Sequence, residues 1–214
     1  MPLRRYSFLD QCLGELQHFV KSVVLPAKNP MMQTPAHEVD ESTLSAKESK
    51  HVAGLMRVDH SGEICAQALY RGQAFVAKSI ETKARLHHAA EEEYNHLSWC
   101  EGRLEDLDAR KSLLNPLWYI GSFAIGATAG LISDKISYGF VIETEKQVMR
   151  HLETHLNELP VQDEKSRVIL MQMYKDEKEH ADKAKLAGGV EFPLWAKLVM
   201  KAQSKVMTSL AYRI

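Results

Sequence analysis

A glutamate and a histidine that share one apolar helix face constrain the fold of this chain more than any other feature. Glu177 and His180 lie three residues apart, which places them on the same face of a helix. Leu170, Met173 and Ala184 continue that face and predict that it points inward. A carboxylate buried among apolar groups is costly unless its charge is compensated. The rest of the chain must therefore supply partners for this pair.

The chain contains four Glu-x-x-His pairs, and their neighbours separate them into two kinds. Glu93 and His96 share a face with Leu86, Leu97 and Cys100, so this pair is also predicted to point inward. The other two pairs are expected on solvated faces: Glu15 with His18, and Glu48 with His51.

Two further glutamates are predicted on inward faces. Glu63 shares its face with Met56 and Tyr70, and Glu145 shares its face with Val141. Glu143 shares its face with charged and polar residues and is predicted to point outward.

The intervals between these acids predict two similar helical hairpins. Glu63 lies 30 residues before Glu93, and Glu145 lies 32 residues before Glu177. A turn at the midpoint of each interval would put both glutamates of a pair at one height, about 24 Å from the turn at about 1.5 Å per residue. The two turns are expected near residues 78–79 and beside Pro160.

The sequence therefore predicts a four-helix bundle with an acidic core. Four carboxylates and two imidazoles in one core need cations, as in di-iron and di-manganese carboxylate bundles. Oxygen-rich ligation with a few imidazoles suits iron or manganese better than structural zinc. The expected metal ligands are Glu63, Glu93, His96, Glu145, Glu177 and His180.

The remainder of the chain also predicts helices, and the fold class is all-α. Hydrophobic residues make up 45 %, and no strand pattern, Gly-rich phosphate loop or CxxC pair is present. We expect residues 1–44 to form an N-terminal helix (6–25) followed by a Pro-containing linker, and residues 45–214 to form the bundle domain. Helical stretches are expected over 45–108, 116–159 and 162–186, with a terminal helix opening at Pro193.

Two segments indicate contact with a membrane surface. Residues 112–133 carry no charge, and the length of this segment approaches that of a membrane span. Its Gly and Ala content favours instead a buried helix, or a helix that dips into a bilayer surface. The terminal helix repeats Lys197, Lys201 and Lys205 beside apolar residues, which suits an anionic membrane face or a cap on the bundle.

Charge and cysteine content narrow the partners and the compartment. The net charge of −1 gives no global field for nucleic acid. Three cysteines without framework spacing favour a reducing compartment, and the start of the chain is a poor secretory signal. We expect a bacterial protein on the cytosolic side of the cell membrane, attached peripherally.

Four motifs together resemble the Coq7 family, the di-iron demethoxyubiquinol hydroxylases of ubiquinone biosynthesis. They are "RVDHSGEICAQALYRGQ" (57–73), "EEYNH" (92–96), "ETEKQVMRHLETHL" (143–156) and "DEKEH" (176–180). The resemblance runs from about residue 45 to the end and is looser over residues 1–44.

The resemblance implies a ferritin-like bundle that holds two iron ions. Glu93 and Glu177 would bridge the metals, Glu63 and Glu145 would be outer carboxylates, and His96 and His180 would each bind one iron. Some members carry His-Tyr where this chain has His151-Leu152. Residues expected beside the ligands, or on the substrate side, are Asp59, His60, His151 and Asp176.

The implied activity is a monooxygenase that uses O₂ to hydroxylate a polyprenyl demethoxy-benzoquinol. NADH or the quinol itself would supply electrons, although the chain shows no dinucleotide-binding fingerprint. A homo-oligomer and contacts with other ubiquinone-biosynthesis proteins would be compatible with this role. The alternatives are a ferritin-like protein for iron storage or peroxide scavenging, and a helical lipid-binding scaffold without metal.

Overall fold

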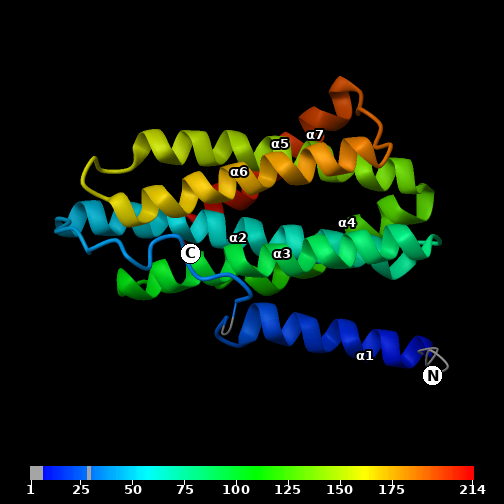
Figure 1. Cartoon of the computed structure of the whole chain (residues 1–214), viewed down its shortest axis with the longest axis horizontal. Coiled ribbons are helices and arrows are strands. Elements are labelled where there is room, and N and C mark those ends of the chain that lie inside the picture. The colour runs from blue at the N-terminus through cyan, green and yellow to red at the C-terminus, as the bar shows by residue number, and fades with distance from the viewer. Residues whose placement is uncertain (1–6, 28–29) are drawn as a thin grey trace.

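The computed structural model describes residues 7–27 and 30–214, which form helices joined by short loops, with no strand in those ranges (Figure 1). The all-α prediction is confirmed. In chain order the helices are α1 (Phe8–Phe19), the π-helical turn η1 (Val20–Val24), α2 (Ala46–Val76), α3 (Ile80–Asp106), α4 (Asn115–Ile132), α5 (Asp134–Glu158), α6 (Glu164–Leu186) and α7 (Leu194–Ala211).

Two helical hairpins build the bundle, as the intervals between the glutamates predict. Helix α2 turns into α3 at residues 77–79, and α5 turns into α6 at residues 159–163. Each second helix begins at a capping side chain: Ser79 accepts from the backbone N–H of Thr82, and Asp163 accepts from that of Ser166. Figure 1 shows the hairpin α5–α6 lying along the hairpin α2–α3.

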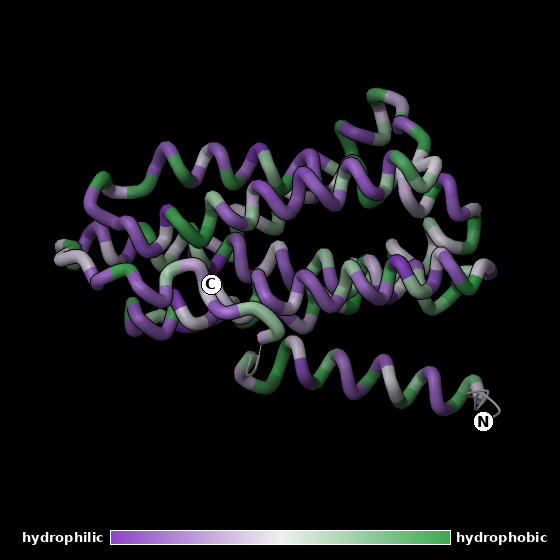
Figure 2. The backbone as a smooth tube through the Cα atoms, viewed as in Figure 1, coloured by the Kyte–Doolittle hydropathy of each residue, from purple (hydrophilic) through white to green (hydrophobic). Residues whose placement is uncertain are grey.

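Two hydrophobic clusters lie on either side of the predicted ligand positions along the bundle. One contains residues that precede the ligands on α2 and α6, such as Leu55 and Leu170, and the other contains residues that follow them, such as Tyr70 and Ala184. Figure 2 shows hydrophilic and hydrophobic residues alternating along the bundle helices, as expected for helices with one face in a core. The polar centre is thus closed at both ends by apolar packing.

Helix α4 packs against α2 at a very short distance, because glycines meet backbone there. A Cβ added at Gly126 would lie 2.1 Å from the carbonyl oxygen of Leu69, and one added at Gly72 would lie 2.1 Å from that of Phe123. Gly130 approaches Gln73 in the same way. The Gly126 and Gly130 pair therefore permits close helix packing, as the sequence predicts.

The uncharged segment is neither a membrane span nor a buried helix. In the described part of the chain, no helix is long and apolar enough to cross a bilayer. Helix α4 buries one face on α2, while Leu117 and Ile120 remain 60 % and 61 % exposed on the other. The helix ends where Ser133 caps α5, so the helical stretches expected over 116–159 are the two helices α4 and α5.

The two Glu-x-x-His pairs expected in solvent have structural partners instead. Glu48 forms a capping box with Ser45 at the start of α2. The His51 ring contacts the Tyr212 hydroxyl at 2.7 Å and the Glu158 carbonyl oxygen at 3.2 Å. The expectation of a solvated face is wrong for His51, because the C-terminal segment covers it.

The expectation of a solvated face is also wrong for the N-terminal pair, Glu15 and His18. Glu15 on α1 accepts two hydrogen bonds from the buried Arg71, at 2.7 and 2.9 Å. His18 is half-buried, and burial lowers its pKa to about 3. The predicted helix over residues 6–25 is α1 continued by η1, and its first residue lies outside the described ranges.

The Pro-containing linker crosses α3 and is fixed to it by hydrogen bonds. The backbone N–H of Met32 donates to Asn95 Oδ1 at 3.0 Å, and Trp99 Nε1 donates to the Met32 carbonyl at 3.2 Å. Arg103 donates to Glu41 at 2.7 Å. The division into residues 1–44 and 45–214 stays a prediction.

We expect Gly126→Ala to destabilise the protein by about 2 kcal/mol, because the added methyl group forces α4 away from α2. Gly121→Ala is the matched control, since its Cβ meets no atom within 4 Å. It should be neutral or stabilising by up to about 1 kcal/mol through helix propensity. Urea unfolding of both variants measures the difference, and equal midpoints would contradict the close-packing explanation.

Candidate metal centre

All six predicted ligands meet in the middle of the bundle. One group comprises Glu63, Glu93, His96 and Glu177, and in it one ligand atom of each residue lies within 4.8 Å of the others. A second group of the same size replaces Glu63 and His96 with Glu145 and His180. The two groups share Glu93 and Glu177. All six side chains are buried, and the four helices α2, α3, α5 and α6 supply them.

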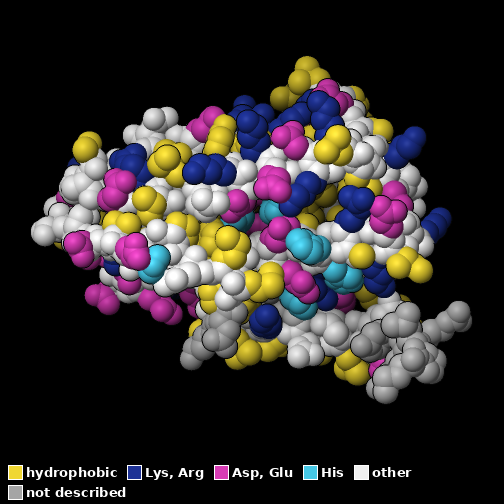
Figure 3. All heavy atoms as spheres, in the orientation of Figure 1, with side chains coloured by type: hydrophobic (Ala, Val, Ile, Leu, Met, Phe, Trp, Pro, Cys, Tyr) yellow, Lys and Arg dark blue, Asp and Glu magenta, His cyan; other side chains and the backbone are white. Residues whose placement is uncertain are grey.

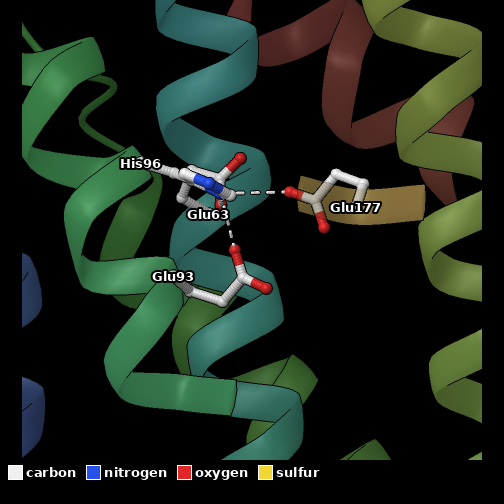
Figure 4. Close-up of side chains that lie close together, drawn as sticks. All are labelled: Glu63, Glu93, His96 and Glu177. Carbon is white, nitrogen blue, oxygen red and sulfur yellow. Dashed lines mark hydrogen bonds and ion pairs between the residues drawn. The ribbon is translucent and has the colours of Figure 1, made fainter. Parts of the chain in front are cut away.

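The two histidines direct the same ring nitrogen at the shared carboxylates. His96 Nδ1 lies 3.0 Å from Glu93, which is also on α3, and 3.1 Å from Glu177 on α6 (Figure 4). His180 Nδ1 lies 2.9 Å from Glu93 and 3.3 Å from Glu177. Each imidazole nitrogen therefore occupies the position from which it can bind a cation together with carboxylate oxygens.

Burial and mutual repulsion disfavour the charged form of two of the four carboxylates in the cluster. Burial, followed by the neighbouring carboxylates, raises the pKa of Glu63 and Glu145 well above their ordinary value. Neither oxygen of Glu145 has a hydrogen-bond partner among the described residues. Burial also disfavours the charged form of Glu93, but His180 and His96 lower its pKa overall.

These observations fit bound metal ions. Divalent cations would replace the protons on Glu63 and Glu145 and would satisfy the free oxygens of Glu145. The donor set of four carboxylates and two imidazoles suits iron or manganese. No Lys or Arg forms an ion pair with any of the six ligands within residues 7–27 and 30–214. The cluster could therefore hold metal ions, which would compensate its carboxylates.

A second layer of carboxylates holds the outer nitrogen of each histidine. Asp176 on α6 lies 3.1 Å from His96 Nε2 on α3, and Glu92 on α3 lies 3.3 Å from His180 Nε2 on α6. Each acid thus holds the histidine of the opposite helix. Such partners fix the tautomer and orientation of a metal-binding imidazole. The hydrogen bond from His180 lowers the pKa of Glu92 to about 2.

These outer acids also bring the centre to the surface. The side chains of Asp176 and Glu92 are 27 % and 31 % exposed. Figure 3 shows histidine and acidic side chains together in the middle of the face that contains α3 and α6 (Figure 3). The sequence predicts Asp176 in this layer but misses Glu92. The sequence contains a signal for Glu92, because Glu92 directly precedes Glu93 just as Asp176 directly precedes Glu177.

For two of the other residues expected beside the ligands, the structure gives polar partners that are not ligands. Asp59 Oδ1 is 2.8 Å from His155 Nδ1 on α5, a partner that the sequence does not reveal. His60 is fully buried beside Glu101 (3.6 Å) and Asn115 (3.3 Å). His60 and Asp59 lie three and four residues before Glu63, and their side chains thus face different helices.

His151 and Glu143 complete the comparison with the sequence predictions. His151 Nε2 lies 2.9 Å from Ser204 Oγ of α7, and His151 lines an apolar cavity, on the side expected for the substrate. Glu143 is buried, so the prediction that it faces solvent is wrong. It accepts from Gln147 at 3.0 Å and from Arg150 at 3.3 Å. Glu145, not Glu143, joins the cluster, as predicted.

A cavity of about 400 Å³ adjoins the centre. Helices α2, α4, α5 and α7 line it and leave it partly open to the surface, and most of its wall is apolar, including Leu69, Leu117, Ile125 and Met207. Glu63 belongs both to this wall and to the ligand cluster. An organic molecule in the cavity would therefore reach the metal centre from the side of α2.

Comparison with known proteins agrees with this geometry. The sequence profile of the family described as "Ubiquinone biosynthesis protein COQ7" matches residues 50–211. The chain belongs to the COQ7 family. It is 58 % identical over 211 residues to a protein of Francisella philomiragia and 59 % identical over 211 residues to one of Francisella tularensis. Both are named 3-demethoxyubiquinol 3-hydroxylase, and each match covers 99 % of this chain and 100 % of the relative.

Membership of the COQ7 family confirms the resemblance and the ferritin-like fold class. It also explains why the motifs around residues 57–73 and 176–180 occur together in one chain. The His-Tyr pair of some members is absent here, and Leu152 lies fully buried in the apolar cluster that includes Leu170 and Met173. That position therefore serves packing in this COQ7-family protein.

We expect Glu92→Gln and Asp176→Asn each to lower metal affinity by about 10- to 100-fold, because the outer nitrogen of a ligand histidine loses its carboxylate. Glu91→Gln is the control, since Glu91 neighbours Glu92 but is exposed. Competition with a chelator measures the affinity. Wild-type affinity in both variants would show that the outer acids do not support the ligands.

Proposed function

We propose that this protein is a di-iron monooxygenase that hydroxylates a polyprenyl demethoxy-benzoquinol, 2-polyprenyl-3-methyl-6-methoxy-1,4-benzoquinol, in ubiquinone biosynthesis. The observation that carries the proposal is the contact between the cavity and the ligand cluster at Glu63. The names of the relatives from Francisella support the same reaction.

The ligand roles follow from the two groups of four residues. Glu93 and Glu177 belong to both groups and are suited to bridge two irons. Glu63 with His96, and Glu145 with His180, would complete the ligands of one iron each. When bound, the iron pair supplies the activation of O₂, which side chains alone cannot perform.

The protein side chains do the remaining work. The apolar wall of the cavity binds the quinol ring and excludes water from the reacting carbon. One atom of O₂ enters the ring C–H bond to form a hydroxyl group, and the other leaves as water after taking up two electrons and two protons. We propose that NADH or the quinol itself provides the electrons from outside this chain.

The cavity also separates this function from its alternatives. A protein for iron storage or peroxide scavenging needs the same ligands but no apolar cavity of about 400 Å³ beside them. A lipid-binding scaffold needs the cavity, but it does not need six buried ligand residues whose carboxylates have no Lys or Arg partner. The two features together favour an enzyme that oxidises an apolar molecule.

We further propose that α4 and α7 rest on the cytosolic face of an anionic membrane. Both helices line the cavity, and both expose apolar residues, such as Leu117 on α4 and Leu198 on α7. Lys201 and Lys205 of α7 are exposed beside them. A polyprenyl substrate dissolved in the bilayer could then enter between these helices without crossing water.

The first test is the lipid-quinone profile, by mass spectrometry, of cells that lack this protein. A demethoxy quinone should accumulate, the wild-type protein should remove it, and Glu177→Ala should not, because a shared ligand is lost. Glu179→Ala is the control on the same helix, where an exposed side chain pairs only with Lys183. Unchanged quinones in the deleted strain would contradict the proposed substrate, and full rescue by Glu177→Ala would contradict the metal centre.

The membrane proposal is tested by sedimentation with vesicles that contain anionic lipid. We expect Lys201→Gln with Lys205→Gln to weaken binding by about thirtyfold, at about 1 kcal/mol per Lys near the surface. Lys175→Gln with Lys178→Gln is the charge-matched control, because these exposed lysines lie on α6. Equal binding of both double variants would show that α7 does not face the lipid.

A further inference from the structure

Asp59 lies in the wall of the substrate cavity, and one of its carboxylate oxygens is buried and unpaired among the described residues. The residue is only 6 % exposed, and it is one of the few charged groups that line this largely apolar space. Its Oδ2 atom has no hydrogen-bond partner among the described residues. A buried acceptor without a donor is costly, so the site is built to receive one.

The other oxygen of Asp59 is held in place. His155 Nδ1 on α5 lies 2.8 Å from Asp59 Oδ1. Burial lowers the pKa of His155, but the charge of Asp59 and its hydrogen bond raise it overall, so the ring is a good donor to this oxygen. Helix α5 thereby fixes the carboxylate, and Oδ2 is left as its buried acceptor without a partner among the described residues.

The position of Asp59 relative to the centre is also favourable. It lies one helical turn before Glu63 on α2, and residues four apart on a helix have their Cβ atoms about 5–6 Å from each other. Both residues line the cavity. A ring anchored at Asp59 would therefore lie beside the carboxylate that connects the cavity to the metal ligands.

We propose that Asp59 is the subsite for a ring hydroxyl group of the substrate, a role that rests on the proposed quinol hydroxylase function. The hydroxyl donates to Asp59 Oδ2, and this bond orients the ring toward Glu63. Asp59 is a positioning residue, and His155 acts through it.

The chemistry of the subsite gives it a preference for one oxidation state. A carboxylate only accepts hydrogen bonds. The reduced ring carries hydroxyl groups that donate, whereas the quinone carries carbonyl groups that only accept. The enzyme therefore binds the quinol in preference to the quinone, and it discriminates before any oxygen chemistry begins.

The experiment compares three ligands that share one ring and one short alkyl tail: the demethoxy quinol, its quinone and its dimethyl ether. The full-length protein is loaded with Zn²⁺, which has no redox chemistry, and the titrations are anaerobic. The fluorescence of Trp118, which lines the cavity, reports binding. We expect the wild type to bind the quinol about ten- to a hundredfold more tightly than the quinone or the ether.

The variant Asp59→Asn should lose this preference and should bind the quinone at least as well as the quinol. Its amide can accept from His155 through Oδ1 and present Nδ2 as a donor to a quinone carbonyl. Thr208→Val is the matched control, because it removes another polar group from the cavity wall and should keep the wild-type preference.

Two results would overturn the proposal. Equal affinity of the wild type for the quinol and its dimethyl ether would do so without any variant, even if Asp59→Asn failed to fold. A retained quinol preference in a folded Asp59→Asn protein would show that Asp59 serves only to hold His155. If the wild type bound none of the three ligands, the proposed quinol function would fail together with the subsite.

Discussion

The structure depends on the convergence of like charges in a dry core. Four glutamates from four helices meet between two apolar clusters, and only two histidines stand among them. Such an arrangement opposes folding of the metal-free chain, because burial raises the pKa of Glu63 and Glu145. The apolar packing at both ends of the bundle must therefore hold the helices in register. In return, the core offers metal ions a complete set of ligands.

The two hairpins solve this problem in the same way. In each one, the first helix contributes a glutamate and the second a Glu-x-x-His pair preceded by an acid. The acids before the pairs, Glu92 and Asp176, cross to the histidine of the other hairpin. This exchange ties α3 to α6 where the ligands keep the backbones apart. These two contacts therefore also connect the two hairpins of the bundle.

Helices outside the bundle adapt this core to an apolar substrate. Helix α4 can lie close to α2 only because Gly72 and Gly126 bring backbone against backbone. That contact places one side of the cavity next to Glu63, and α7 closes the other side. Asp59 then supplies a polar anchor within the apolar wall. Under this proposal, the metal ligand Glu63 and the substrate anchor Asp59 lie on one helix, α2.

The sequence by itself determined the main helices and the six residues that form the candidate ligand cluster. The period of the apolar residues identified the inward faces, and the intervals of 30 and 32 residues located the turns, because both are local properties of a helix. Only the tertiary structure decided which helix each remaining polar group meets. Glu143 is buried against Arg150, His51 is covered by Tyr212, and Asp59 faces His155 rather than the ligands. Some of these contacts join residues that are distant in the sequence, and others depend on which neighbouring helix covers a face. Helical periodicity contains no information about either.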